Sequence, residues 1–114
     1  MAAIRRFDIA YTETAIQDIE EKAVYISQQL RDASAAETWY FRLRRTIQED
    51  LSTFPYKFPL YDRAPWNKRG IRFMTTRSDV VLYSVDERAG VVYIRGVFTR
   101  GRDLSAHLDM RDPN

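Results

Sequence analysis

Two apolar runs near the C-terminal end of the chain, Val80 to Val85 and Val91 to Phe98, flank the polar segment 86–90, which ends in a glycine. Runs of β-branched and aromatic residues joined by a short glycine-containing loop are typical of a β-hairpin. Nearly every residue of both runs is apolar, so both faces of the sheet should be covered there. The pattern therefore predicts a hairpin at the centre of a sheet.

Upstream of this hairpin, apolar residues recur at helical spacing in two consecutive segments. Thr12 is the expected N-cap of the first helix, a capping box at Ser34–Glu37 begins the second, and Pro55 ends it. Each helix has one apolar stripe and the link between them is short, so they should pack as antiparallel neighbours against a third surface, the sheet. The stripes are Ile16, Ile19, Ala23, Ile26 and Leu30, then Ala36, Tyr40, Leu43, Ile47, Leu51 and Phe54, widened by Trp39.

The remaining segments complete the element order. Residues 4–10 are expected to form an edge strand, 55–66 an ordered aromatic connector in which prolines exclude a central strand, and 70–75 another strand. Residues 105–114 are expected to form a flexible tail. The order strand, helix, helix, strand, strand, strand predicts an α+β fold, and the length of 114 residues predicts a single domain over 1–114.

Composition removes several classes of protein. The chain has no cysteine and one histidine, His107, so we expect neither a disulfide framework, a zinc site nor any other metal or cofactor site. No apolar run is long enough for a membrane span, and no signal-peptide pattern is present, so a cytoplasmic protein of bacterial type is expected.

Charge is distributed unevenly along the chain. Residues 1–57 contain 8 basic and 9 acidic residues, a net charge of −1, whereas residues 63–102 contain 9 basic and 3 acidic residues, a net charge of +6. This asymmetry favours an anionic partner, either nucleic acid or an acidic protein segment, although a solvated arginine-rich surface has the same composition. Arg42, Arg44 and Arg45 in the second helix are interpreted as a solvent-exposed face with Glu49 and Asp50 as counter-charges.

An ordered set of short motifs covers nearly the whole chain. They are Thr-x-x-Ala15-x-x-Asp18-Ile19, Ile47-x-x-x-Leu51-x-x-Phe54-Pro55, Gly70-Ile-Arg72, Leu82-Tyr83-x-Val85-Asp86-Glu87 and Gly101-Arg102-Asp103. In this order and spacing the chain resembles the RelE/ParE superfamily of toxins from type II toxin–antitoxin pairs. The resemblance implies a helical hairpin packed on a curved, mainly antiparallel four-stranded sheet. It also implies a growth-arresting toxin that forms a hetero-oligomer with a neutralising antitoxin.

The superfamily includes ribosome-dependent mRNA endonucleases and ParE-like inhibitors of DNA gyrase. Metal-free RNA cleavage needs a base, an acid and cations around the phosphate. The resemblance places Arg72 at a family arginine, but residues 79–81 lack the arginine often found before the hairpin core. Thr99 stands where a nuclease often has histidine. Tyr83 could donate a proton if nearby arginines lowered its pKa, but it is better interpreted as a core residue.

Three hypotheses follow. The preferred one is a non-enzymatic ParE-like toxin that binds gyrase. The second is an mRNA endonuclease acting on the ribosome, and the third is a non-toxic binding module of the same fold. The expected target-binding residues are Arg72, Arg95, Arg100 and Arg102. For a nuclease, the expected catalytic residues are Arg72, Arg77, Tyr83 and Arg102, with Lys68 and Arg69 binding nucleic acid.

Overall fold

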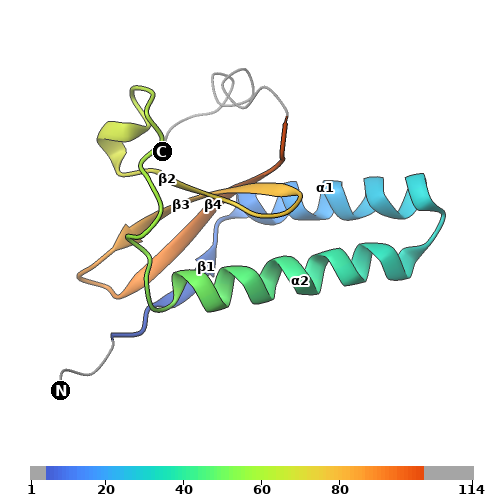
Figure 1. The fold of residues 1–114 in the computed structure, drawn as a ribbon, viewed down its shortest axis with the longest axis horizontal. Helices are drawn as coiled ribbons and strands as arrows, with labels where there is room; N and C mark the ends of the chain where they lie inside the picture. Colours follow the sequence, from blue (N-terminus) through green and yellow to red (C-terminus); the bar gives the residue numbers. More distant parts are fainter. Residues whose placement is uncertain (1–4, 102–114) are drawn as a thin grey trace.

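The computed structural model describes residues 5–101 of the chain, which form a helical hairpin packed on one face of a four-stranded sheet (Figure 1). This arrangement and the order β-α-α-β-β-β confirm the predicted α+β fold. The predicted tail at 105–114, His107 and Arg102 lie outside the described residues. The elements are β1 Asp8–Tyr11, α1 Glu13–Leu30, α2 Ala33–Leu51, the 3-10 helix η1 Asn67–Arg69, β2 Arg72–Thr75, β3 Asp79–Asp86 and β4 Val91–Thr99.

The sheet has the strand order β1-β4-β3-β2, so the β3–β4 hairpin is central, as the sequence predicts. β2, β3 and β4 pair antiparallel, and the edge strand β1 pairs parallel with β4. β1 begins later than the predicted residue 4. The N–H of Phe7 donates to the carbonyl of Ser52 at the end of α2 (2.7 Å), and only from Asp8 onward does the backbone join the β4 ladder.

The helix caps agree with the prediction at one helix and differ at the other. Thr12 caps α1, its hydroxyl accepting from the N–H of Ala15 (3.2 Å). The cap of α2 is Asp32 and not Ser34, because the Asp32 carboxylate accepts from the N–H of Ser34 (2.9 Å). Arg31 adopts the left-handed conformation that ends α1, which leaves Asp32 extended in the position of an N-cap.

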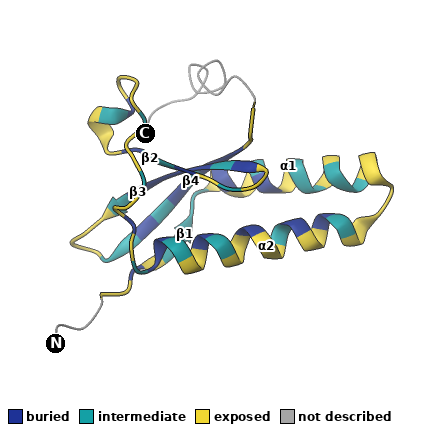
Figure 2. Cartoon of the chain, viewed as in Figure 1, coloured by how far each residue is buried: buried dark blue, intermediate teal, exposed yellow. Residues whose placement is uncertain are grey.

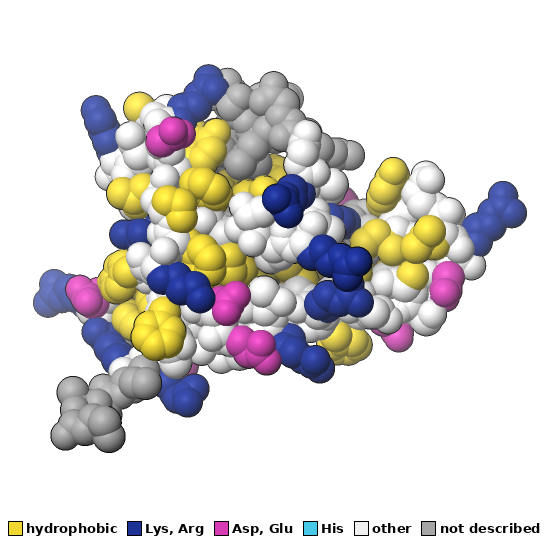
Figure 3. Space-filling view, in the orientation of Figure 1, with side chains coloured by type: hydrophobic (Ala, Val, Ile, Leu, Met, Phe, Trp, Pro, Cys, Tyr) yellow, Lys and Arg dark blue, Asp and Glu magenta, His cyan; other side chains and the backbone are white. Residues whose placement is uncertain are grey.

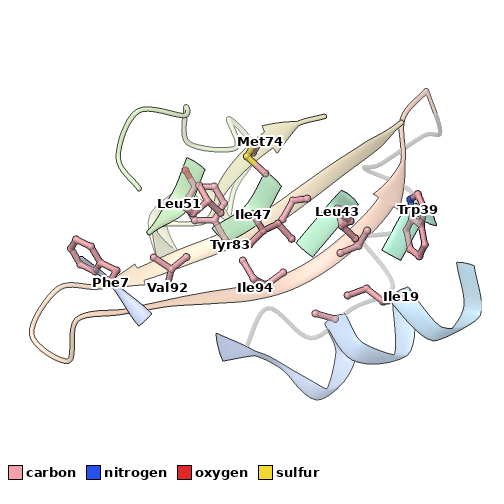
Figure 4. Packing of buried hydrophobic residues seen from close by; sticks show 13 residues of the cluster. Phe7, Ile19, Trp39, Leu43, Ile47, Leu51, Met74, Tyr83, Val92 and Ile94 are labelled. Carbon is pink, nitrogen blue, oxygen red and sulfur yellow. The ribbon is translucent and has the colours of Figure 1, made fainter. Parts of the chain in front are cut away.

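Only part of each predicted apolar stripe is buried (Figure 2). Trp39, Leu43, Ile47 and Leu51 of α2 form a row that faces Tyr83 and Ile94 of the sheet (Figure 4). The helical hairpin extends beyond the sheet, as Figure 1 shows, and there each helix has only the other helix to pack against. Leu30, a predicted stripe residue at that end of α1, is 64% exposed. Two other predicted stripe residues are exposed for other reasons: Ile16 (44%) lies in the first turn of α1, and Phe54 (56%) lies beyond the end of α2.

Both faces of the central hairpin are covered, as predicted. Alternation along β3 places Val81 and Tyr83 in the core under the helices, and Val80 and Leu82 on the opposite face. On that face the connector packs a second apolar cluster, with buried Trp66, Ile71, Leu82 and Phe98 and half-buried Tyr61, Phe73 and Val80.

A β-bulge interrupts the central hairpin. Leu82 pairs with Gly96 and Tyr83 pairs with Ile94, which leaves Arg95 as the extra residue of β4. Just beyond it, the N–H of Val97 donates to the carboxylate of Asp18 in α1 (3.0 Å). Asp18 is half-buried, and this hydrogen bond connects the first helix to the bulged strand.

Candidate functional site

The cations predicted to bind a target, or to act in a nuclease, lie in separate places. Arg77, in the turn before β3, and Arg100, just after β4, are both exposed at the same end of the sheet, where the N–H of Arg100 donates to the Ser78 carbonyl (2.9 Å). Arg95 lies in the middle of β4, and its Nε donates to the Ser84 hydroxyl (2.7 Å). Lys68 and Arg69 are exposed on η1, in the connector. Arg102 lies outside the described residues.

Arg72 and Tyr83, neighbours in the β2–β3 register, both bind the connector backbone. The Arg72 guanidinium donates to the carbonyls of Tyr56 (3.3 Å) and Phe58 (2.6 Å). The Tyr83 hydroxyl donates to the carbonyl of Pro55 (2.7 Å), and Tyr83 is 0% exposed. Burial raises the pKa of Tyr83, and the charge of Arg72 offsets only part of that effect. The interpretation of Tyr83 as a core residue is confirmed.

Replacing Tyr83 with phenylalanine is therefore expected to lower stability without changing the biological activity. The Pro55 carbonyl loses its donor in the core, which costs about 1–3 kcal/mol. Because the unfolded chain ionises tyrosine near pH 10 while folded Tyr83 stays protonated, the unaltered protein should lose stability as pH rises above 10, and Tyr83→Phe should lose less. Urea unfolding at pH 7 and 10.5 measures both effects, and a growth assay checks activity. Loss of activity in a folded Tyr83→Phe variant would contradict this structural role.

The sheet face opposite the helices has no row of cations where the hairpin begins. Val80, Leu82 and Phe98 lie there, and Trp66 and Ile71 of the connector pack against Leu82 and Phe98. A surface that stabilises a phosphorane needs cations directed at the developing charge. In residues 5–101, this part of the sheet is an apolar packing surface.

A buried polar network, which the sequence pattern did not reveal, joins the helices to the start of β3. Asp79 is 2% exposed, and its carboxylate forms an ion pair with Lys22 of α1. The same carboxylate accepts hydrogen bonds from Nε1 of Trp39 in α2 (2.9 Å) and the hydroxyl of Ser78 (3.0 Å). Trp39 also lies under the Lys22 ammonium, 5.2 Å from its ring centre. Asp79 lies in the segment where the resemblance leads one to expect an arginine. Its carboxylate instead connects α1 and α2 to the start of β3.

An apolar hollow opens between the two helices beside the end of β1. Its volume is about 360 Å³, and its lining consists of Tyr11, Ile16, Ile19, Glu20, Ala23, Tyr40 and Arg44. Partly exposed Ile16 and half-buried Ala23 supply the apolar surface from α1. A concave apolar surface between helices is a usual place for a ligand or a partner helix.

Arg44 provides the positive charge at this hollow. Its guanidinium lies 5.0 Å from the ring centre of Tyr11 and 5.7 Å from that of Tyr40, and it donates to the Tyr40 hydroxyl (2.8 Å). Burial raises the pKa of Tyr11, so its hydroxyl is uncharged at neutral pH beside the positively charged Arg44. No carboxylate within residues 5–101 forms an ion pair with Arg44. The expected counter-charge Asp50 instead lies 3.9 Å from Lys57, which corrects the interpretation of Arg44 as a paired surface residue.

Within residues 5–101, no helix is both long and apolar enough to cross a membrane. No group of three or more histidine, cysteine, aspartate or glutamate side chains between residues 5 and 101 is arranged to hold a metal ion.

Comparison with solved structures identifies similar folds. A chain of the RelBE2 toxin–antitoxin complex from Mycobacterium tuberculosis superposes with a TM-score of 0.62 and is 17% identical, covering 90% of this chain and 100% of that chain. A chain of the chromosomal ParDE system from P. aeruginosa superposes with a TM-score of 0.66 and is 11% identical, covering 82% of this chain and 96% of that chain. The sequence matches no family model and no curated protein.

At this level of identity the likeness defines the fold. The protein has the fold found in these RelBE and ParDE chains, which confirms the RelE/ParE-like fold that the sequence motifs implied. Both similar chains come from toxin–antitoxin systems, one of each branch that the resemblance includes.

Proposed function

We propose that this protein is the toxin of a type II toxin–antitoxin pair, held inactive by a cognate antitoxin. Three observations support this proposal: the fold shared with chains of RelBE2 and ParDE, the ordered motifs along the chain, and the unfilled apolar hollow between the helices. The hollow suits an amphipathic helix, because it offers an apolar surface with the Arg44 cation beside it.

The antitoxin helix would place apolar side chains against Ile16 and Ala23 and a carboxylate near Arg44. Apolar side chains at positions i and i+3 or i+4 of the antitoxin helix lie on one face of that helix. Such a face can pack into a hollow that is lined by two helices. The acidic character of the partner follows from the same geometry, because Arg44 has ring and hydroxyl contacts but no ion pair in the described chain. A carboxylate there would gain a charge-assisted contact in a partly dehydrated place.

The toxin is proposed to act by binding its target without cleaving it. The observation that carries this choice is the burial of Tyr83, whose hydroxyl is bonded to Pro55, together with the threonine at position 99. Tyr83 is therefore closed to a substrate, and position 99 carries no side chain that transfers a proton near neutral pH. DNA gyrase is the proposed target, and Arg77 and Arg100 at one end of the sheet, with Arg95 nearer its middle, are the proposed contacts.

Gyrase inhibition can be measured directly. Purified gyrase is incubated with relaxed plasmid, ATP and increasing amounts of the protein, and supercoiling is followed on agarose gels. The proposal predicts that supercoiling stops, and that the double variant Arg77→Ala and Arg100→Ala inhibits at least tenfold less. The matched double variant Arg42→Ala and Arg45→Ala, on the outer face of α2, should inhibit like the unaltered protein. Unchanged supercoiling at saturating protein would contradict gyrase as the target.

A ribosome-dependent mRNA endonuclease is the second candidate. The net charge of +6 over residues 63–102 favours it, with Lys68, Arg69, Arg77 and Arg100 exposed for phosphate contacts. Primer extension on cellular mRNA after induction distinguishes the two, because a nuclease gives cuts within translated codons and a gyrase inhibitor leaves messages intact.

A further inference from the structure

A second apolar hollow lies at the opposite end of β1 from the first, where α2 ends. Its volume is about 430 Å³, and its lining consists of Arg5, Phe7, Thr53, Phe54, Pro55, Tyr56, Lys57 and Glu87. Two aromatic residues remain open to solvent there, Phe54 at 56% and Tyr56 at 46%. Figure 3 shows apolar side chains gathered around this end of α2, with Lys and Arg side chains among them.

The backbone beside the exposed rings is hydrogen-bonded to two residues of the sheet. The Pro55 carbonyl accepts from Tyr83, and the Tyr56 carbonyl accepts from Arg72. Phe7 packs edge-on against Tyr56, with ring centres 6.4 Å apart. An exposed aromatic side chain on a rigid backbone is typical of a binding hot spot, because little conformational freedom remains to be lost on binding. The residues expected to be catalytic thus help to present an aromatic surface.

The charges around this hollow suit a peptide better than a nucleic acid. Arg5 lies over the ring of Phe7 (4.7 Å) and donates to the Glu87 carbonyl. Lys57 has one long, exposed contact with Asp50, which contributes little. Single-stranded nucleic acid is bound along a continuous row of cations. Here the lining contains two cations, Arg5 and Lys57, and most of its other residues are apolar.

We propose that the antitoxin of the pair anchors a second part of its chain in this hollow. One apolar or aromatic side chain would pack against Phe54 and Tyr56, with flanking carboxylates near Arg5 and Lys57. This inference rests on the proposed function, and it adds a second contact to the helix between α1 and α2. Tyr11 lines the first hollow and Phe7 the second, roughly 13 Å apart along an extended strand, so about four extended residues of the antitoxin would connect the two anchors.

The test uses the full-length protein and the product of the neighbouring reading frame, co-expressed and then separated for titration. Phe54→Ala and Tyr56→Ala are each expected to raise the Kd at least tenfold. Lys57→Glu should also raise the Kd, and by a larger factor in low salt than in high salt. Leu30→Ala is the matched control, because Leu30 is 64% exposed at the far end of α1 and should change the Kd less than twofold. Circular dichroism confirms that each variant is folded.

Three outcomes would overturn the inference. If the complex forms and both aromatic variants bind within twofold of the unaltered protein, the second anchor does not exist, while the proposed function stands. If a fluorescein-labelled 12-nucleotide uridine strand binds and Phe54→Ala abolishes only that binding, the occupant is nucleic acid. If the unaltered protein does not bind the neighbouring product, the proposed pair fails, and this anchor fails with it.

Discussion

Replacing Asp79 with alanine is expected to lower the free energy of unfolding by about 3–5 kcal/mol, because it removes one partner of a buried ion pair. Lys22, whose side chain is only 14% exposed, would lose its ion-pair partner, and the indole N–H of Trp39 would lose its acceptor. Domains of this size are stable by about 5–15 kcal/mol, so the loss would leave the protein close to unfolding at 37 °C. Urea unfolding followed by tryptophan fluorescence measures the change.

Two variants separate the contributions to this network. Asp79→Asn keeps an acceptor for Trp39 and removes the charge, so it should fall between the unaltered protein and Asp79→Ala. Glu49→Ala removes an exposed carboxylate of α2 and should change stability by less than about 0.5 kcal/mol. An Asp79→Ala variant that loses less than 1 kcal/mol would show that the network contributes little to the fold.

Replacing Ile16 with aspartate is expected to weaken antitoxin binding at least 100-fold. Ile16 lines the hollow between the helices and is 44% exposed, so the free protein tolerates a polar residue there. A bound apolar helix would remove the new carboxylate from water beside Ala23, and this carboxylate would compete for Arg44 with the acidic residue of that helix, so binding should lose several kcal/mol. The Kd for the neighbouring product reports the effect, and co-expression should no longer protect cells.

The matched control is Val24→Asp. Val24 is 55% exposed on the same helix and does not line the hollow, so the same chemical change should alter the Kd less than threefold. Equal binding by Ile16→Asp and the unaltered protein would place the antitoxin elsewhere.

Most of the fold follows from the hydrophobic pattern. The hairpin at 80–98 is predicted with both faces covered because nearly every residue in it is apolar, and the structure packs the helices on one face and the connector on the other. The helix spacing likewise identifies Ile19, Leu43, Ile47 and Leu51 as core residues. Ile16 and Leu30 fit the same spacing but are exposed. Leu30 lies at the end of α1 beyond the sheet, and Ile16 lines the hollow between the helices; periodicity defines a helix face and shows neither.

The candidate site was harder to predict, since it depends on contacts between distant residues. Nothing in the spacing of Lys22, Trp39 and Asp79 shows that they meet, and a buried aspartate at the start of a strand reads as a turn residue. The sequence likewise gives no sign that the guanidinium of Arg72, predicted to bind a target, is bonded to the connector backbone. Phe54 was expected to end a core stripe, but it lies beyond the last turn of α2 and opens to solvent. Its position next to Pro55 was the available signal, because a helix face ends where proline ends the helix.

The most direct measurement of the central claim is controlled induction of the protein in cells with and without the neighbouring reading frame. DNA synthesis, protein synthesis and mRNA integrity are followed over the first minutes by labelled thymidine, labelled methionine and primer extension. The account predicts that growth stops only without the neighbouring product, that DNA synthesis falls first, and that messages stay intact. Normal growth without the neighbouring product would contradict the proposal that the protein is a toxin. Messages cut within codons would contradict the proposal that it acts by binding alone.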